Sequence, residues 1–185
     1  MDSIIEMILG EVGDCVHQVS AESLARASAL IESSSRIFVA GAGRSGLCMR
    51  AFGMRLMHLG KTVHVVGETT TPGIAVTDLL VLGSGSGRTT SLCAMAEQAR
   101  RLGAQILLFT TNAESPLARL SDLQVVIPAP SFRVMDEMRD SRSVQPLGTL
   151  FEQSMLILGD SLILGMMQRT GVSAVQMFAR HANLE

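Results

Sequence analysis

The chain has 185 residues, a formal net charge of −2, and no Trp or Tyr. This length predicts one domain with a core of useful size, and the weakly acidic charge and missing aromatic platforms argue against nucleic-acid binding. Three scattered cysteines form no C-x-x-C pair, so neither a disulfide framework nor a zinc site is indicated, and a reducing cytoplasm is the expected compartment.

Residues 1–35 predict two helices. Apolar residues recur at helical spacing over 3–19, and Ser20 has the residue type of an N-cap for a second helix through Ile31. No apolar run is long enough for a signal peptide or a membrane span, so no membrane partner is expected. The positive mean hydropathy instead predicts apolar surface covered between subunits.

Residues 36–130 change to short β-rich runs that alternate with helical patterns. Such alternation predicts a parallel sheet covered by helices on both faces. The predicted strands are 37–40, 63–66, 79–82, 106–110 and 125–127, and the predicted helices between them are 46–59, 89–102 and 116–120. Gly60 and Gly103 stand where helices are expected to end.

Residues 147–185 predict a long final helix over 148–169 and a short tail over 173–185. Together with the preceding segments they are expected to form a single domain, 1–185. The polar stretch 128–146 precedes that helix, and its length predicts a functional or interface loop.

The loops after the first four predicted strands are the expected binding rim. In a doubly wound sheet, ligands bind beyond the carboxyl ends of the strands. These loops span 41–45, 67–72, 83–89 and 110–115. Because they follow parallel strands, we expect them to share one edge of the sheet.

The loop after the third predicted strand carries the strongest binding signal. It reads GSGSGRT over 83–89. Glycines let the backbone approach a ligand closely, and the first amides of the following helix have no internal acceptor. Ser84, Ser86 and Thr89 add hydroxyl groups. The pattern predicts a phosphate cradle, and a flexible Gly/Ser linker is the alternative.

A second glycine-rich turn, GAGRSG over 41–46, has the G-x-G-x-x-G spacing of dinucleotide sites. Glu68 lies a little later than the acidic residue which that fingerprint requires. Three interpretations stay open: nucleotide binding, a tight strand–helix turn without a ligand, and a part of the binding rim. In the last case Arg44 and Ser45 add a charge and a hydroxyl.

Two polar residues near the end of the chain are candidates for acid–base chemistry. Glu152 lies in the first turn of the predicted final helix, where a simple partner for the helix dipole is the alternative. His181 lies in the tail. His58 and His64 fall inside a predicted helix and a predicted strand, so structural roles are expected for them.

These segments resemble the sugar isomerase (SIS) domain family. The resemblance runs through almost the whole chain in the expected order. It is carried by IFVAGAGRSG (37–46), AFGMRLMHLG (51–60), VVGETTTP (65–72), LLVLGSGSG (79–87), TTNAESPLARLSD (110–122), IPAP (127–130), QPLGTLFEQS (145–154) and MFARHANLE (177–185). It implies a three-layer αβα sandwich around a five-stranded parallel sheet. It also implies a homotetramer with active sites near subunit interfaces, and no metal or organic cofactor.

The resemblance further implies an activity, the interconversion of D-arabino-3-hexulose 6-phosphate and D-fructose 6-phosphate. This step belongs to formaldehyde fixation through ribulose monophosphate and couples to a 3-hexulose-6-phosphate synthase. Glu152 and His181 match the catalytic pair of the family. The positions that match its phosphate-binding residues are Ser45, Ser84, Ser86, Gly87 and Thr89, and further candidates for substrate binding are Gly43, Arg44, Glu68 and Arg88.

Arg88 departs from the family pattern, which usually has Glu between the glycine and the threonine of S-G-E-T. An arginine there either helps neutralise a phosphate or leaves a contact of the usual glutamate unmade. Two other functions stay open: another aldose–ketose isomerase of sugar phosphates, and a sugar-phosphate sensor that is not an enzyme. The chain length argues against the extra domains that usually accompany those proteins.

Overall fold

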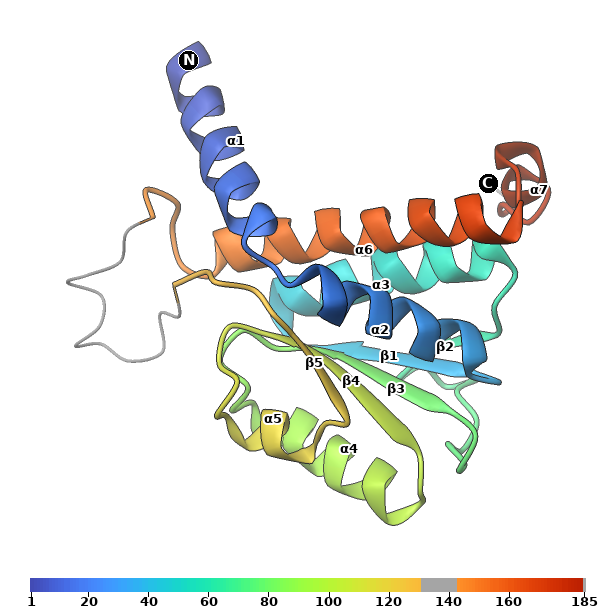
Figure 1. Ribbon diagram of the computed structural model, residues 1–185. Helices are drawn as coiled ribbons and strands as arrows, with labels where there is room; N and C mark the ends of the chain where they lie inside the picture. Colours follow the sequence, from blue (N-terminus) through green and yellow to red (C-terminus); the bar gives the residue numbers. More distant parts are fainter. Residues whose placement is uncertain (131–142, 185) are drawn as a thin grey trace.

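The structure is a computed structural model that describes residues 1–130 and 143–184 (Figure 1). Most of the polar stretch 128–146, which the sequence predicts to be a functional or interface loop, lies outside the described residues. The rest of the chain folds around a single sheet, and its two ends lie on the same side of that sheet (Figure 1).

The sheet has five parallel strands in the order β2-β1-β3-β4-β5, which confirms the predicted fold class. Their bounds are β1 Ile37–Gly41, β2 Val63–Val65, β3 Leu79–Gly83, β4 Gln105–Thr110 and β5 Leu123–Val126. All five residues of β3 are buried, which explains why it reads as an unbroken apolar run in the sequence. The predicted strands therefore agree with the structure to within two residues.

Helices cover both faces of this sheet (Figure 1). On one face lie α2 Ala21–Ser33, α3 Gly43–Leu59 and α6 Thr149–Thr170, and on the other lie α4 Thr90–Arg101 and α5 Pro116–Leu120. Helix α1, Asp2–His17, packs mainly against α6 and projects beyond the sheet. The short helix α7, Ala174–Phe178, follows the far end of α6.

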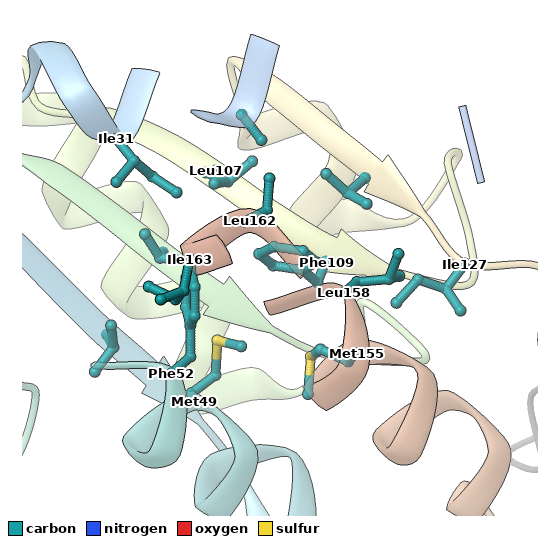
Figure 2. Close-up of a cluster of buried hydrophobic side chains, with 14 of the residues drawn as sticks. Ile31, Met49, Phe52, Leu107, Phe109, Ile127, Met155, Leu158, Leu162 and Ile163 are labelled. Atoms are coloured by element: carbon teal, nitrogen blue, oxygen red, sulfur yellow. The ribbon is translucent and has the colours of Figure 1, made fainter. Parts of the chain in front are cut away.

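Helix α6 is the centre of the larger core layer. Its side chains interdigitate with those of α3 and the sheet, as Met155, Leu158 and Phe109 illustrate (Figure 2). By length and hydropathy this 22-residue helix could cross a membrane, yet half of its apolar window is buried inside the domain. That burial is what the central helix of a packed α/β core requires.

The strand order creates a switch point between β1 and β3. The chain leaves β1 toward α3 on one face of the sheet and leaves β3 toward α4 on the other. Diverging connections of this kind open a crevice at the carboxyl ends of the two strands, where doubly wound proteins bind their ligands. The fold therefore fixes the position of the candidate site.

Candidate active site

A pocket of about 360 Å³ opens at this switch point. That volume suits a small molecule. The pocket is lined by residues 42–45, 83–86 and 147–149, together with Thr89, Thr111, Pro130, Phe151 and Glu152. Three of the four predicted loops, those after β1, β3 and β4, thus share one rim, and the start of α6 supplies the opposite wall. The loop 67–72 after β2, which was also expected at this rim, does not line the pocket.

Three helices begin at this pocket without a capping side chain. The N-cap residues of α3, α4 and α6 are Ala42, Thr89 and Gly148, and none accepts a hydrogen bond from its own helix through its side chain. In contrast, α2, α5 and α7 begin elsewhere and are capped by the serines 20, 115 and 173. Uncapped first turns leave amide donors and the positive end of each helix dipole free for an anion.

The loop after β3 presents its backbone to the pocket in a fixed orientation. The carbonyl oxygen of Gly85 accepts hydrogen bonds from the hydroxyl of Thr110 at 3.0 Å and from the hydroxyl and amide of Thr111 at 2.9 and 3.0 Å. Because the peptide is planar and trans, the amide of Ser86 points away from these threonines. Within the described residues, the amides of Gly85 and Ser86 donate to no acceptor, so both are available to a ligand.

Gly87 shapes this loop without lining the pocket. Its φ is +60°, and its amide donates to the carbonyl of Ser84 at 3.2 Å. A Cβ atom at Gly87 would lie 2.0 Å from Ser115 Oγ. Gly87 matches a phosphate-binding position of the family, but here its left-handed backbone shapes the loop and its amide is bonded within the protein.

Arg44 and Glu152 form an ion pair across the pocket. Arg44 Nε lies 3.1 Å from Glu152 Oε2, and its Nη1 lies 3.4 Å from Thr149 Oγ1. The Glu152 side chain is 14% exposed, whereas that of Arg44 is 59% exposed. A cation in the first turn of a helix opposes the helix dipole, so Arg44 gains little from α3 itself. Its position is explained by the Glu152 carboxylate and the Thr149 hydroxyl.

The thiol of Cys48 lies behind this pair, 3.5 Å from the carbonyl oxygen of Glu152. Burial raises the pKa of Cys48, and the nearby Glu152 carboxylate raises it further. The thiol therefore stays protonated and acts as a weak donor to the backbone.

The glycines of the G-x-G-x-x-G turn have a packing role. A Cβ atom at Gly46 would lie 2.5 Å from the carbonyl oxygen of Gly41, so β1 and α3 can approach only because both positions are glycine. Glu68 pairs with Arg50 at 2.8 Å and does not line the pocket. These contacts favour the tight turn over a nucleotide site. Gly43, Arg44 and Ser45 do line the pocket.

Arg88 and His181 also lie outside the pocket of their own chain. The Arg88 side chain is exposed and forms no ion pair with the described residues. His181 stacks on His58 with ring centroids 5.2 Å apart, beyond α7. Glu152 lies in the first turn of α6, and α7 follows the other end of that helix. At the usual helical rise, about 27 Å separate Glu152 from that other end. One chain thus cannot bring His181 to Glu152 in this conformation.

Sequence reasoning missed the wall formed by Leu147, Gly148 and Thr149. Thr149 is nearly buried, and its hydroxyl bridges the Pro146 carbonyl, at 2.6 Å, and Arg44. The sequence does contain an indication of this wall: Thr149 stands three residues before Glu152, so a helix places both on the same side.

The fold and pocket define the class: a doubly wound parallel α/β protein with a switch-point pocket that is lined by three helix starts and one carboxylate. A comparison with family models identifies the family, because the model of the SIS domain matches residues 30–135. The chain belongs to the SIS domain family.

Relatives extend this match over nearly the whole chain. A 3-hexulose-6-phosphate isomerase of Mycobacterium gastri is 44% identical and covers 98% of this chain and 89% of its own length. One of Bacillus subtilis is 41% identical, with 96% and 95% covered. The crystal structure of a hypothetical protein of Methanococcus jannaschii, from which a 3-hexulose-6-phosphate isomerase function was inferred, has a TM-score of 0.83 at 30% identity. It covers 99% of both chains.

Proposed function

We propose that the protein is an isomerase that interconverts D-arabino-3-hexulose 6-phosphate and D-fructose 6-phosphate. The observation that carries the proposal is the Glu152 carboxylate, held by Arg44 beside three uncapped helix starts. A cytoplasmic location and coupling to the synthase that makes the 3-hexulose phosphate belong to the same proposal, which the relatives' names support.

The phosphate of the substrate binds at the start of α4, against the Gly85 and Ser86 amides and the hydroxyls of Ser84, Ser86 and Thr89. Ser45, on the opposite side of the switch point, adds a hydroxyl from α3. A phosphate carries charge on several oxygens, which several donors can share. Its seat at the end of the sugar chain holds C2 and C3 near Glu152 and removes orientational freedom from the reaction.

Glu152 transfers the proton between the two carbons. From the 3-hexulose it removes the C2 proton, and the electron pair moves toward the C3 carbonyl to give an enediolate. Delivery of the proton to C3 then leaves the carbonyl at C2. In the ligand-free protein Arg44 neutralises this base, and the enediolate oxygens provide Arg44 with a competing negative partner in the reaction.

His181 exchanges protons at O2 and O3, and it reaches the pocket from a neighbouring subunit. Its distance from Glu152 along α6 supports this assignment. Large apolar side chains that a second copy would cover are exposed on α1 (Ile4, Ile5, Met7, Leu9), α3 (Leu47, Met54, Met57), α6 (Leu156, Ile157, Leu164) and α7 (Val175, Phe178). Such a surface is typical of a subunit interface, and a homotetramer accommodates it.

The activity is tested with fructose 6-phosphate in D₂O, followed by NMR. The proposal predicts 3-hexulose 6-phosphate and exchange of the fructose C3 proton with solvent. An aldose–ketose isomerase would instead exchange a C1 proton, and a sensor would bind without exchange. Glu152→Gln should lower turnover by roughly 10²-fold or more, the usual scale for a lost acid–base group. Glu97→Gln, on the exposed side of α4, is the control.

The contribution of His181 from a neighbour is tested by mixing two inactive variants. Glu152→Gln and His181→Ala chains are unfolded, mixed and refolded together. If each site takes its histidine from another subunit, about a quarter of the sites regain both groups, because the two chains assemble at random around the symmetry axes. Activity no higher than that of the separate variants would place the histidine in the same chain.

A further inference from the structure

The carboxylate of Glu11, on α1, anchors the segment that precedes α6. One oxygen accepts the amide of Val144 at 2.8 Å. The other accepts the hydroxyl of Ser143 at 2.9 Å and the side-chain amide of Gln145 at 3.0 Å. These residues lie more than 130 positions apart from Glu11 in the sequence. The contact therefore joins the N-terminal helix to the segment before α6, which is distant from it in the sequence.

The anchored segment continues directly into the wall of the pocket. The Pro146 carbonyl accepts both the amide of Thr149, at 3.2 Å, and its hydroxyl, at 2.6 Å. Leu147 between them has a φ of +56°. A leucine in the left-handed region is strained and persists only when its surroundings hold it there.

The same wall reaches the ion pair in the pocket. Thr149 Oγ1 accepts Arg44 Nη1 at 3.4 Å, and Arg44 Nε holds the carboxylate of Glu152. Hydrogen bonds from Glu11 to residues 143–145, the chain from there to Thr149, and the contacts of Arg44 thus link Glu11 to Glu152. Helix α1 also packs on α6 itself.

The negative charge of Glu11 suits its role as the anchor of residues 143–145. Burial alone would raise the pKa of Glu11, but the hydrogen bonds from Val144, Gln145 and Ser143 outweigh it and lower the pKa. Glu11 is therefore a carboxylate near neutral pH, and hydrogen bonds to a charged acceptor are stronger than those between neutral groups.

We propose that Glu11 is a positioning residue for the isomerase site: its carboxylate fixes residues 143–145 and so sets the Leu147–Thr149 wall and the place of Arg44. A contact that only fastened α1 to residues 143–145 would stabilise the protein but would leave its affinity for ligands unchanged. The proposal rests on the function proposed above, and its test uses readouts that do not require turnover.

The test compares Glu11→Gln with Glu6→Gln, which changes an exposed carboxylate on the same helix. Gln keeps the size of Glu but replaces one acceptor oxygen by a donor. We expect hydrogen exchange at the amides of Val144, Thr149 and Glu152 to accelerate about tenfold in Glu11→Gln, the scale of one lost bond to a charged group. Exchange in β3 should not change. The dissociation constants of fructose 6-phosphate and inorganic phosphate should rise about tenfold by calorimetry.

Glu6→Gln should match the wild type in all of these measurements. Faster exchange in Glu11→Gln with unchanged affinity for both ligands would overturn the proposal and show that the contact only stabilises the protein. Unchanged exchange would overturn the proposal as well. A wild-type protein that binds both ligands without turnover would contradict the isomerase activity, yet the affinities of Glu11→Gln would still decide the part of Glu11.

Discussion

Arg44 Nε and Glu152 Oε2 lie 3.1 Å apart, and they join the start of α3 to the start of α6 across the pocket. Glu152 is the one carboxylate among the residues that line the pocket in the described chain. The pair thus brings the candidate base and the most direct source of positive charge to the place where an enediolate would form. Helix dipoles add to that positive field from both sides.

Arg44→Met should lower kcat/KM by about 10²- to 10³-fold, the range seen when one group that stabilises an oxyanion is removed. Arg44→Lys should recover part of the loss, because it keeps the charge but not the planar fork. Steady-state kinetics with fructose 6-phosphate measure both. Arg50→Met is the matched control, since Arg50 lies on the same helix and pairs with Glu68 outside the pocket. An Arg44→Met enzyme as active as this control would remove Arg44 from the mechanism.

Ser86→Ala and Thr89→Val should act on affinity rather than on chemistry. Each removes one hydroxyl from the proposed phosphate seat, and one lost hydrogen bond to a charged group should raise KM by about tenfold or more. The inhibition constant of inorganic phosphate should rise in parallel, while kcat stays within a small factor. Ser91→Ala, two residues after Thr89, exposed and outside the lining of the pocket, should have neither effect. Unchanged KM values in both variants would argue against the cradle.

Gly87→Ala should disturb the loop after β3. The new Cβ would lie 2.0 Å from Ser115 Oγ, and a φ of +60° disfavours alanine, so a loss of about 1–3 kcal/mol in stability is expected. Phosphate affinity should fall with it. Gly13→Ala, within α1 and without any atom within 4 Å of its Cβ, should instead stabilise the protein by about 0.5–1 kcal/mol. Urea unfolding measures both, and equal effects would contradict the structure.

Stability should fall in two stages as the pH decreases. Burial lowers the pKa of His58, and Arg55 and His181 lower it further. The unfolded chain therefore binds this proton more readily, so the contribution of His58 is complete above its ordinary value of 6.5 and declines as the pH drops through it. The folded pKa of Asp78 is also lowered: burial opposes this, but Arg36 and the amide of Ala75 outweigh it. Its contribution, like that of Glu11, is lost at lower pH.

Urea titrations from pH 8 to pH 3 measure these stages. The free energy of unfolding should decline first below about pH 6.5 and again below about pH 4.5, the ordinary values of the groups concerned. His58→Gln should remove the first decline and leave the second. A curve for the wild-type protein that stays flat between pH 7 and pH 5.5 would contradict the assignment to His58.

Much of the fold could be predicted because local patterns decide it. The β3 strand reads as a short apolar run bounded by Asp78 and Gly83, and the left-handed Gly60 ends α3 as the sequence indicates. The loop over 83–89 was recognisable for the same reason: its glycines, hydroxyls and following helix are neighbours in the chain. The resemblance to the SIS family implied one five-stranded parallel sheet, which the structure confirms.

The remaining features depend on contacts between distant segments. The pattern placed Glu68 on the binding rim, but β2 is the edge strand, and its loop brings Glu68 to Arg50 instead. The order of the strands in the sheet decides where Glu68 lies, and the spacing of residues along the chain does not reveal that order. The anchor from Glu11 to residues 143–145 likewise joins segments that are more than 130 positions apart in the sequence. The proximity of Arg44 to Glu152 also requires α3 and α6 to be packed together.

The most direct test of the central claim is a crystal structure of the Glu152→Gln protein with fructose 6-phosphate bound. We expect the phosphate to lie against the amides of Gly85 and Ser86 and the Thr89 hydroxyl, with C2 and C3 next to the side chain at position 152. A phosphate seated elsewhere, or a sugar chain that leads away from that side chain, would contradict it.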